Sequence, residues 1–271
     1  MQAIAETITL LLIAPLREEL PMVRGHLPDL VLGGCSAWPL PADETCAGLA
    51  RAYLRVALTA VRLPGEQMDD VMLAVSELVT NGLRHGVGSA RSSPGRDVLE
   101  LWVYHRVTPE SQFVFKVFDP MTEWTRSAKG GGAWAEGGRG MGIVDAVSRE
   151  WGWHRARSRL GLLPVTGKAT WFCIATPTHV PLQRPGPLPW QAAVALSRLL
   201  IARGLDGTRC RHGVDRSVVV LRGLSVWSEP PGLFRWRVRP GTRDAYAVRP
   251  YADLHDVADE VISRHECGAG A

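Results

Sequence analysis

The 271-residue sequence predicts an α+β protein, with helices layered on one face of a sheet and a second, smaller α+β unit. Three observations support this class. Two helical patterns come first, strand patterns rich in Val, Phe and Trp follow in pairs, and five prolines gather in residues 177–189. We read the proline-rich stretch as a semi-rigid linker between the two units.

Composition and charge narrow the class of protein. Hydrophobic residues make up 46% of the chain, which is enough for an ordinary buried core, and the net charge is only +4. Because this charge is mild and interspersed, we expect no direct contact with nucleic acid. The apolar stretch at residues 8–16 is far shorter than the roughly 20 residues that a membrane span needs. We therefore expect a cytoplasmic protein without membrane contact.

The cysteines argue against a disulfide-bonded scaffold. Their number is odd and none has C-x-x-C spacing: Cys35, Cys46, Cys173, Cys210 and Cys267. The sequence therefore predicts reduced cysteines and no structural zinc site.

Hydrophobic periodicity places the elements of the first unit. It predicts one helix over residues 43–61 and a second over 66–85, with Leu63-Pro64-Gly65 ending the first. Strand patterns and a shorter helical pattern follow. The strands are expected at 98–105, 112–118, 151–157 and 168–176, and the shorter helix at 143–149.

The chain divides into four parts by this reading. Residues 1–36 form an N-terminal extension that three prolines break up, residues 37–177 form the first domain, and 178–189 form the linker. Residues 190–271 form the small second unit. Within it we expect helices at 190–203 and 253–264 and strands at 217–221, 224–227, 233–238 and 245–248.

Glu77 and Asn81 are the most informative polar pair, in the segment V-S-E-L-V-T-N-G-L-R-H-G of the second helix. Residues four apart project from the same helix face. An amide oxygen beside a carboxylate suits a magnesium ion that bridges nucleotide phosphates, with the carboxylate free to orient or deprotonate an attacking hydroxyl. Taken alone, Glu77 and Asn81 could equally be two polar side chains that face water on the helix surface.

Two further features favour a nucleotide site. Asp119 ends the apolar strand F-V-F-K-V-F-D, where a carboxylate can accept a hydrogen bond from the amino group of adenine, although such aspartates also form simple turns. The run G-G-R-G-M-G at 137–142 stands directly before a helix. Glycine-rich backbone at a helix N-terminus presents N–H groups to an anion such as a phosphate chain.

The order and spacing of these motifs resemble the GHKL ATPase superfamily, and most closely the actinobacterial anti-sigma regulatory ATP-binding proteins. Glu77 and Asn81 match the N box of that family, and Asp119 matches its adenine-binding position. Gly138, Gly140 and Gly142 match its G2 box. The segment 167–172, G-K-A-T-W-F, resembles the last motif, in which a threonine supports the aspartate.

The resemblance covers about half the chain and implies a Bergerat-type sandwich: a mixed sheet covered by helices on one face. It also implies ATP and Mg²⁺ as ligands, with Asn81 on the metal, Glu77 as general base and Thr170 closing the adenine site. The backbone amides from Gly138 to Gly142, that of Met141 included, would hold the phosphates.

Two arginines have more than one interpretation. Arg51, on the first helix, stands where the kinases of this family place an arginine near the phosphates or the partner, and a solvated surface charge explains it equally well. Arg139, within the glycine run, could make charge-assisted contacts to phosphate or face solvent in an open lid.

One departure from the family pattern concerns the start of the lid. The family continues from the aspartate to a glycine two residues on, whereas this chain reads Asp119-Pro120-Met121. Adenine recognition tolerates this change more readily than lid closure does. Nucleotide binding is therefore expected more firmly than turnover.

Three functions are compatible with the sequence. The first is a Mg-ATP-dependent serine/threonine kinase that phosphorylates an anti-anti-sigma-type partner, as the resemblance implies. The second is a non-catalytic, ATP-responsive module that sequesters a sigma factor or another regulator. In the third, the nucleotide site is vestigial and the C-terminal unit carries the function. Kinases of this family are often dimers, so a homodimer is among the expected assemblies.

Overall fold

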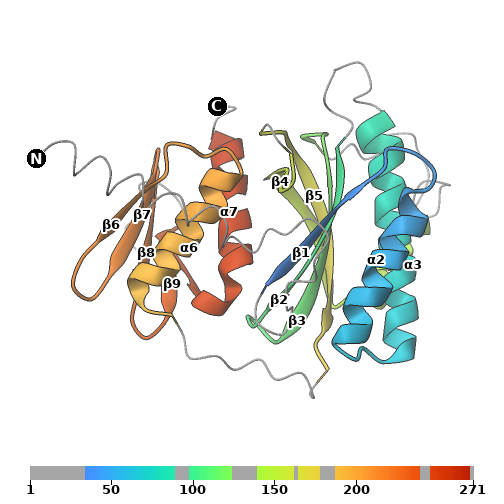
Figure 1. The fold of residues 1–271 in the computed structure, drawn as a ribbon, viewed down its shortest axis with the longest axis horizontal. Coiled ribbons are helices and arrows are strands. Elements are labelled where there is room, and N and C mark those ends of the chain that lie inside the picture. The colour runs from blue at the N-terminus through green and yellow to red at the C-terminus, as the bar shows by residue number, and fades with distance from the viewer. Residues whose placement is uncertain are drawn as a thin grey trace, which may run out of the picture.

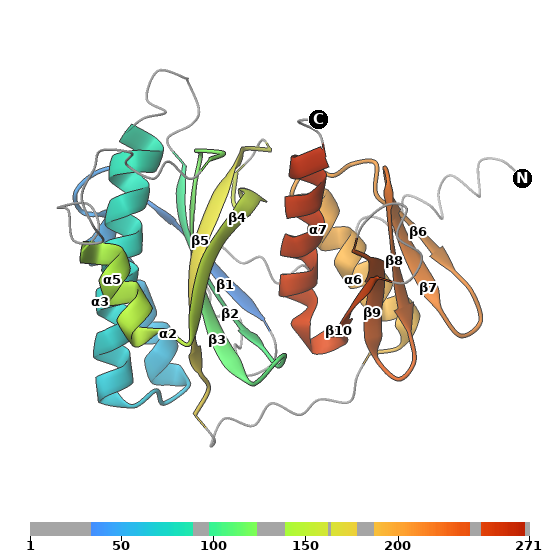
Figure 2. The ribbon, with the colours of Figure 1, turned by 180° about the vertical axis from the view of Figure 1, so that it is seen from behind.

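The computed structural model describes residues 34–88, 98–123, 139–161, 164–177, 187–238 and 245–268. These residues form four layers: a helical layer, a sheet, a second pair of helices and a second sheet (Figures 1 and 2). The α+β class that the sequence predicts is confirmed. The Pro-rich linker and the N-terminal extension lie largely outside the described residues, and the proposed domain boundaries stay predictions.

The first sheet has the strand order β1-β2-β3-β5-β4. Its strands are β1 (Cys35–Leu40), β2 (Leu99–Arg106), β3 (Gln112–Asp119), β4 (Glu150–Arg157) and β5 (Thr166–Ala175). Every neighbouring pair is antiparallel, so the expectation of a mixed sheet is wrong for the described strands. β2 and β3 are buried along their whole length, which requires cover on both faces.

β1 was not expected, because its six residues fall at the boundary placed between the extension and the first domain. It is the edge strand, and each of its residues faces a partner on β2, from Cys35 opposite Tyr104 to Leu40 opposite Leu99. Pro39 lies within it, and proline is tolerated on an edge strand, where its missing N–H disturbs no inner ladder.

One face of this sheet is covered by α2 (Cys46–Ala60), α3 (Gly65–Asn81) and α5 (Arg139–Val147). α2 and α3 confirm the two long predicted helices, and their apolar stripes share one core with the sheet. Ala50, Leu54 and Leu58 of α2 and Val71 and Val75 of α3 are completely buried in it. Burial of these stripes, at about 25 cal/mol per Å² of apolar surface, holds the helices on the sheet.

α3 does not continue as an α-helix to His85, as the periodicity suggested. It ends at Asn81 and continues as a π-helix, η3 (Gly82–Val87). A β-carbon added at Gly82 would lie 2.8 Å from the side chain of Leu99, and one added at Gly86 would lie 2.5 Å from that of Asp119. Glycine permits this close approach of helix and sheet, and π-turns inside helices are frequent at functional sites.

The second unit contains α6 (Pro189–Ala202), a five-stranded sheet of order β10-β9-β8-β7-β6, and α7 (Leu254–Gly268), which follows the short 3₁₀-helix η4 (Tyr251–Asp253). The strands are β6 (Arg209–His212), β7 (Ser217–Leu221), β8 (Leu224–Glu229), β9 (Leu233–Arg237) and β10 (Tyr246–Pro250). Both helices share a core with this sheet. β6, a short exposed strand with little apolar signal, was not expected.

α7 joins the two units, because its two faces contact different sheets (Figure 2). Val257, Val261 and Ile262 are buried in the core of the second unit. Its acidic face lies instead against the outer face of the first sheet. There Asp259 lies 2.7 Å from Lys116 of β3.

Asp259 is the centre of this interface. Arg159 lies 3.1 Å from one of its oxygens, and Arg203, at the end of α6, donates a hydrogen bond to the same oxygen. Burial opposes ionisation of this aspartate, but Lys116, Arg203 and Arg159 together hold the pKa of Asp259 well below its ordinary value. The first sheet is therefore enclosed between helices on both faces.

All five cysteines are free, and three of them, Cys35, Cys46 and Cys173, are buried. Among the described residues, no helix combines the length and the apolar character that crossing a membrane requires.

Candidate functional site

α3 carries the polar pair on which the expected nucleotide site rests. Glu77 and Asn81 lie one helical turn apart and are both half-buried. Neither side chain has a hydrogen bond or an ion pair to another described residue. A carboxylate and an amide that are half-buried and have no partner among the described residues can bind a ligand.

The N-terminus of α5 lies against Glu77. A β-carbon added at Gly140 would lie 2.4 Å from Oε2 of Glu77, so the glycine backbone and the carboxylate are in close contact. Helix α5 starts at Arg139, four residues earlier than the sequence suggested, so Gly140, Met141 and Gly142 belong to its first turn. First-turn N–H groups have no acceptor within the helix. No described residue accepts a hydrogen bond from them, and N–H groups at a helix start can bind an anion, here beside Glu77.

Not all of the expected phosphate-binding residues can be placed. Gly138 and the side chain of Arg139 lie outside the described part of the chain. Met141 packs against the core of the first unit, which leaves only its backbone amide for a phosphate. Gly142 is exposed, with no atom within 4 Å of the position of a β-carbon.

Asp119 lies at the other end of the α3–η3 segment. It ends β3, points toward the helical layer and is only 2% exposed. The glycine at position 86 lies directly over its carboxylate. Gly86 is nine positions after Glu77, roughly 13 Å along a helix axis, so the site is elongated, with one carboxylate at each end.

The carboxylate of Asp119 has two protein donors on one oxygen. The backbone N–H of Met121 donates to Oδ1 at 3.0 Å, and Nζ of Lys168 lies 2.7 Å from the same atom. Burial raises the pKa of Asp119, and Lys168, the Met121 N–H and His85 counteract this rise. Oδ2 has no hydrogen-bond donor among the described residues, which leaves it free to accept one.

Thr170 is close to this end of the site but does not touch the aspartate through a hydrogen bond. It lies opposite Val117 in the β3–β5 ladder, whereas Lys168 lies opposite Asp119 itself. Residues two apart on a strand share a face, so Lys168 and Thr170 both point toward the helices. Thr170 was predicted from the sequence and Lys168 was not, because the register that pairs Lys168 with Asp119 cannot be read from spacing alone.

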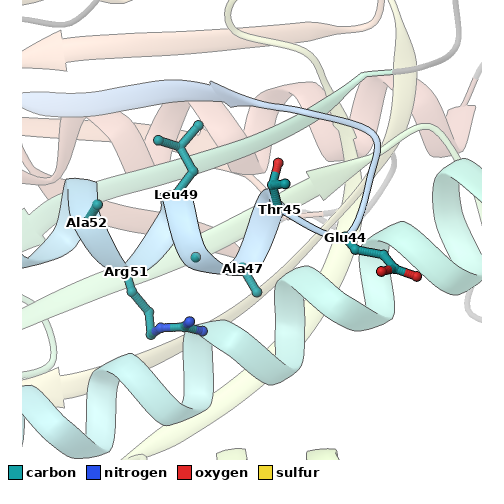
Figure 3. Close-up of a pocket in the computed structure, with 7 residues that line it drawn as sticks. Glu44, Thr45, Ala47, Leu49, Arg51 and Ala52 are labelled. Carbon is teal, nitrogen blue, oxygen red and sulfur yellow. The ribbon is translucent and has the colours of Figure 1, made fainter.

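Arg51 extends from α2 toward α3 (Figure 3). Its guanidinium donates a hydrogen bond to the Ser76 hydroxyl at 3.0 Å and makes no hydrogen bond or ion pair with Glu77 or Asn81. A shallow cleft lies beside it on α2. The cleft is lined by Glu44, Thr45, Ala47, Gly48, Leu49, Arg51 and Ala52. A second cleft, between the start of α2 and the end of α3, is lined by Asp43, Glu44, Cys46, Ala47, Thr80, Leu83, Arg84 and Gly88.

Three parts of the candidate site follow one another along the chain: first the polar pair on α3, then the aspartate at the end of β3, and last the glycine-rich start of α5. Residues 40–162 match the family model of the histidine kinase-like ATPase domain. None of the curated proteins that were compared with the chain matches it. The histidine kinase-like ATPase match supports the GHKL resemblance and implies ATP binding, while it specifies neither a kinase activity nor a partner.

The residues of the matched region fit a nucleotide with Mg²⁺. Within the described residues, no group of three or more His, Cys, Asp and Glu side chains could hold a metal ion by itself. Magnesium at nucleotide sites needs only one or two protein oxygens, since phosphates and water supply the rest. Asn81 is half-buried and has no hydrogen bond to another described residue, so it can supply such an oxygen, and the first turn of α5 can bind phosphate.

Proposed function

We propose that the protein is an ATP-dependent regulator of the anti-sigma type that phosphorylates a serine or threonine of an anti-anti-sigma-type protein. One observation supports this proposal: Glu77 and Asn81, which have no hydrogen bond or ion pair to another described residue, lie together beside the first-turn N–H groups of α5. A pure ATP-binding module needs the phosphate site but has no use for an additional carboxylate there.

Each residue has one role in this proposal. Asn81 supplies an oxygen to Mg²⁺, which neutralises charge on the phosphates when it is bound. The α5 N–H groups hold the phosphate oxygens. Glu77 accepts the proton of the partner's hydroxyl group as its oxygen bonds to the γ-phosphorus, and ADP leaves. Asp119 holds the base at the far end of the site.

The test is phosphate transfer by the full chain. Labelled Mg-ATP is incubated with the wild-type protein and its isolated binding partner, and label on serine or threonine is quantified. We expect Glu77→Ala to reduce transfer by at least about 100-fold while ATP affinity stays the same. Glu66→Ala, in the first turn of the same helix, is the matched control and should transfer normally.

A second candidate function is a binding module that sequesters a regulator without phosphorylating it. The outer face of α2 favours it, since Arg51, Arg55 and Val56 are exposed there, Val56 by 59%. In that case Arg55→Glu would weaken partner binding by about tenfold or more, while Glu77→Ala would change neither binding nor labelling. Undiminished labelling by Glu77→Ala, or none by the wild type, would exclude the proposed kinase mechanism.

A further inference from the structure

The contact between Asp119 and Lys168 places a carboxylate and an ammonium side by side at the base end of the site. The two residues face each other across β3 and β5, and Nζ lies 2.7 Å from Oδ1. Both side chains are buried, with 3% and 8% of their surfaces exposed. Buried groups held this way have little freedom to turn elsewhere.

The hydrogen-bonding capacity of this pair is only partly used. Oδ1 of Asp119 accepts from Met121 and from Lys168, and Oδ2 accepts from no described residue. A lysine ammonium has three N–H groups. Among the described residues, Lys168 donates a hydrogen bond to one carboxylate, that of Asp119. A free acceptor and a donor with spare capacity therefore lie next to each other.

The carboxylate acceptor and the ammonium donor are complementary to the edge of adenine that carries C6 and N1. Adenine presents an amino donor at C6 beside an acceptor at ring nitrogen N1. Guanine presents the reverse, an acceptor at C6 and an N–H at position 1. In the same orientation guanine would bring oxygen against the carboxylate and N–H against the ammonium, and buried polar groups without partners are costly.

We propose that Lys168 is a specificity-determining residue that donates a hydrogen bond to N1 of adenine while Asp119 accepts one from the C6 amino group. The inference rests on the proposed ATP site and assigns to it a second base-reading side chain. The charge on Lys168 makes its hydrogen bond stronger than a neutral one. The pair thereby selects adenine over guanine and hypoxanthine nucleotides.

The competing explanation is that Lys168 only balances the buried charge of Asp119. The two explanations differ in what the ring nitrogen contributes. If Lys168 binds N1, replacing that nitrogen by C–H removes a charged hydrogen bond, which corresponds to about 10- to 100-fold in affinity. If Lys168 is only a counter-ion, the same replacement changes nothing.

The experiment is a calorimetric titration of the full chain with Mg-ATP and with the Mg complex of 1-deaza-ATP. The wild type should bind 1-deaza-ATP at least about tenfold more weakly than ATP. In Lys168→Met the two nucleotides should bind with equal, reduced affinity, and Lys168→Arg should restore a preference for ATP. The wild-type comparison needs no variant, so it stands even where Lys168→Met fails to fold.

Equal affinity of the wild type for ATP and 1-deaza-ATP would overturn the inference and leave the ATP site intact. An unchanged preference for ATP in Lys168→Met would overturn it as well. Absence of binding by both nucleotides would instead overturn the proposed function itself, and the inference with it.

Discussion

Gly86 lies so close to Asp119 that no side chain fits between them. A β-carbon there would lie 2.5 Å from the carboxylate group. Gly86→Ala should therefore displace Asp119, weaken ATP binding by about tenfold or more and lower the free energy of unfolding by about 1–3 kcal/mol. Calorimetry and urea unfolding measure these two effects.

The control for this variant is Gly65→Ala, at the start of the same helix, where no atom lies within 4 Å of the new β-carbon. It should bind ATP normally and be as stable as the wild type or slightly more stable. Normal ATP affinity in Gly86→Ala would contradict the role of Asp119 as the base-binding residue.

Gly140 and Gly142 provide a second matched pair, both in the first turn of α5. A β-carbon at Gly140 would lie 2.4 Å from Oε2 of Glu77, whereas one at Gly142 has open space around it. Because the Glu77 carboxylate is at the end of a flexible side chain, Gly140→Ala should leave stability nearly unchanged and displace that carboxylate. We expect phosphate transfer to fall by about tenfold or more in Gly140→Ala and to stay normal in Gly142→Ala.

At the scale of residues, the sequence predicts those site residues that belong to motifs with a fixed spacing. Glu77, Asn81 and Asp119 were predicted that way, and their expected places on one helix and at one strand end are confirmed, while their role at a nucleotide site stays a prediction. Lys168 was not found, because its proximity to Asp119 depends on the register of two strands that are far apart in the sequence. The contact of Arg51 with Ser76 depends likewise on how two helices pack.

At the scale of elements, strong hydrophobic periodicity was sufficient to predict a helix or strand from the sequence, and weak periodicity was not. α2 and α3 have regular apolar stripes and were predicted well. β1 and β6 are short edge strands whose signal is a few residues long, and both were missed. The π-turn was missed for a different reason. It follows from packing of two glycines against the sheet, which periodicity does not report.

The acidic face of α7 has an energetic consequence at this scale. Removing the Asp259 carboxylate would leave the buried Arg159 and Arg203 without their ion-pair partner and Lys116 with only Asp256, at 3.9 Å. Asp259→Ala should therefore lower the free energy of unfolding by about 3–5 kcal/mol, measured by urea unfolding.

The comparison variant is Glu229→Gln, which breaks a 2.8 Å ion pair with Arg235, a side chain that is 46% exposed. An exposed pair of this kind contributes about 1 kcal/mol or less. A small effect of Asp259→Ala, similar to that of Glu229→Gln, would show that α7 is not held on the sheet by these charges.

At the scale of the whole molecule, the two units are joined through buried charged and polar groups. The sequence predicted two units but placed helices on only one face of the first sheet. α7 covers the other face through its acidic residues, a contact that was not predicted from the sequence. Their basic partners, such as Lys116 and Arg159, lie more than 95 residues away along the chain and gave no local signal.

This junction should be sensitive to acid. His255 on α7 is buried among Arg159, Arg203, Lys116 and Asp259, and burial together with the nearby cations lowers its pKa to about 3. Below about pH 6.5 the unfolded chain binds a proton at this histidine that the folded protein does not bind. The free energy of unfolding therefore decreases as the pH is lowered. Because of His255 alone, the free energy of unfolding should be about 2 kcal/mol lower at pH 5 than at pH 7.

Urea unfolding at the two pH values measures this loss. His255→Gln should lose about 2 kcal/mol less than the wild type between pH 7 and pH 5, and His212→Gln, at an exposed position, should behave like the wild type. Equal pH dependence of the wild type and His255→Gln would contradict the neutral, buried state of this histidine.

Nucleotide binding by residues 40–162 is the claim on which the functional account depends. The most direct test is calorimetric titration of the full chain with ADP and a non-hydrolysable ATP analogue, with and without Mg²⁺, for the wild type and Asn81→Ala. We expect binding to the wild type that strengthens with Mg²⁺, and loss of the magnesium-dependent part in Asn81→Ala. No binding to the wild type at millimolar nucleotide would contradict the account and direct attention to the C-terminal unit.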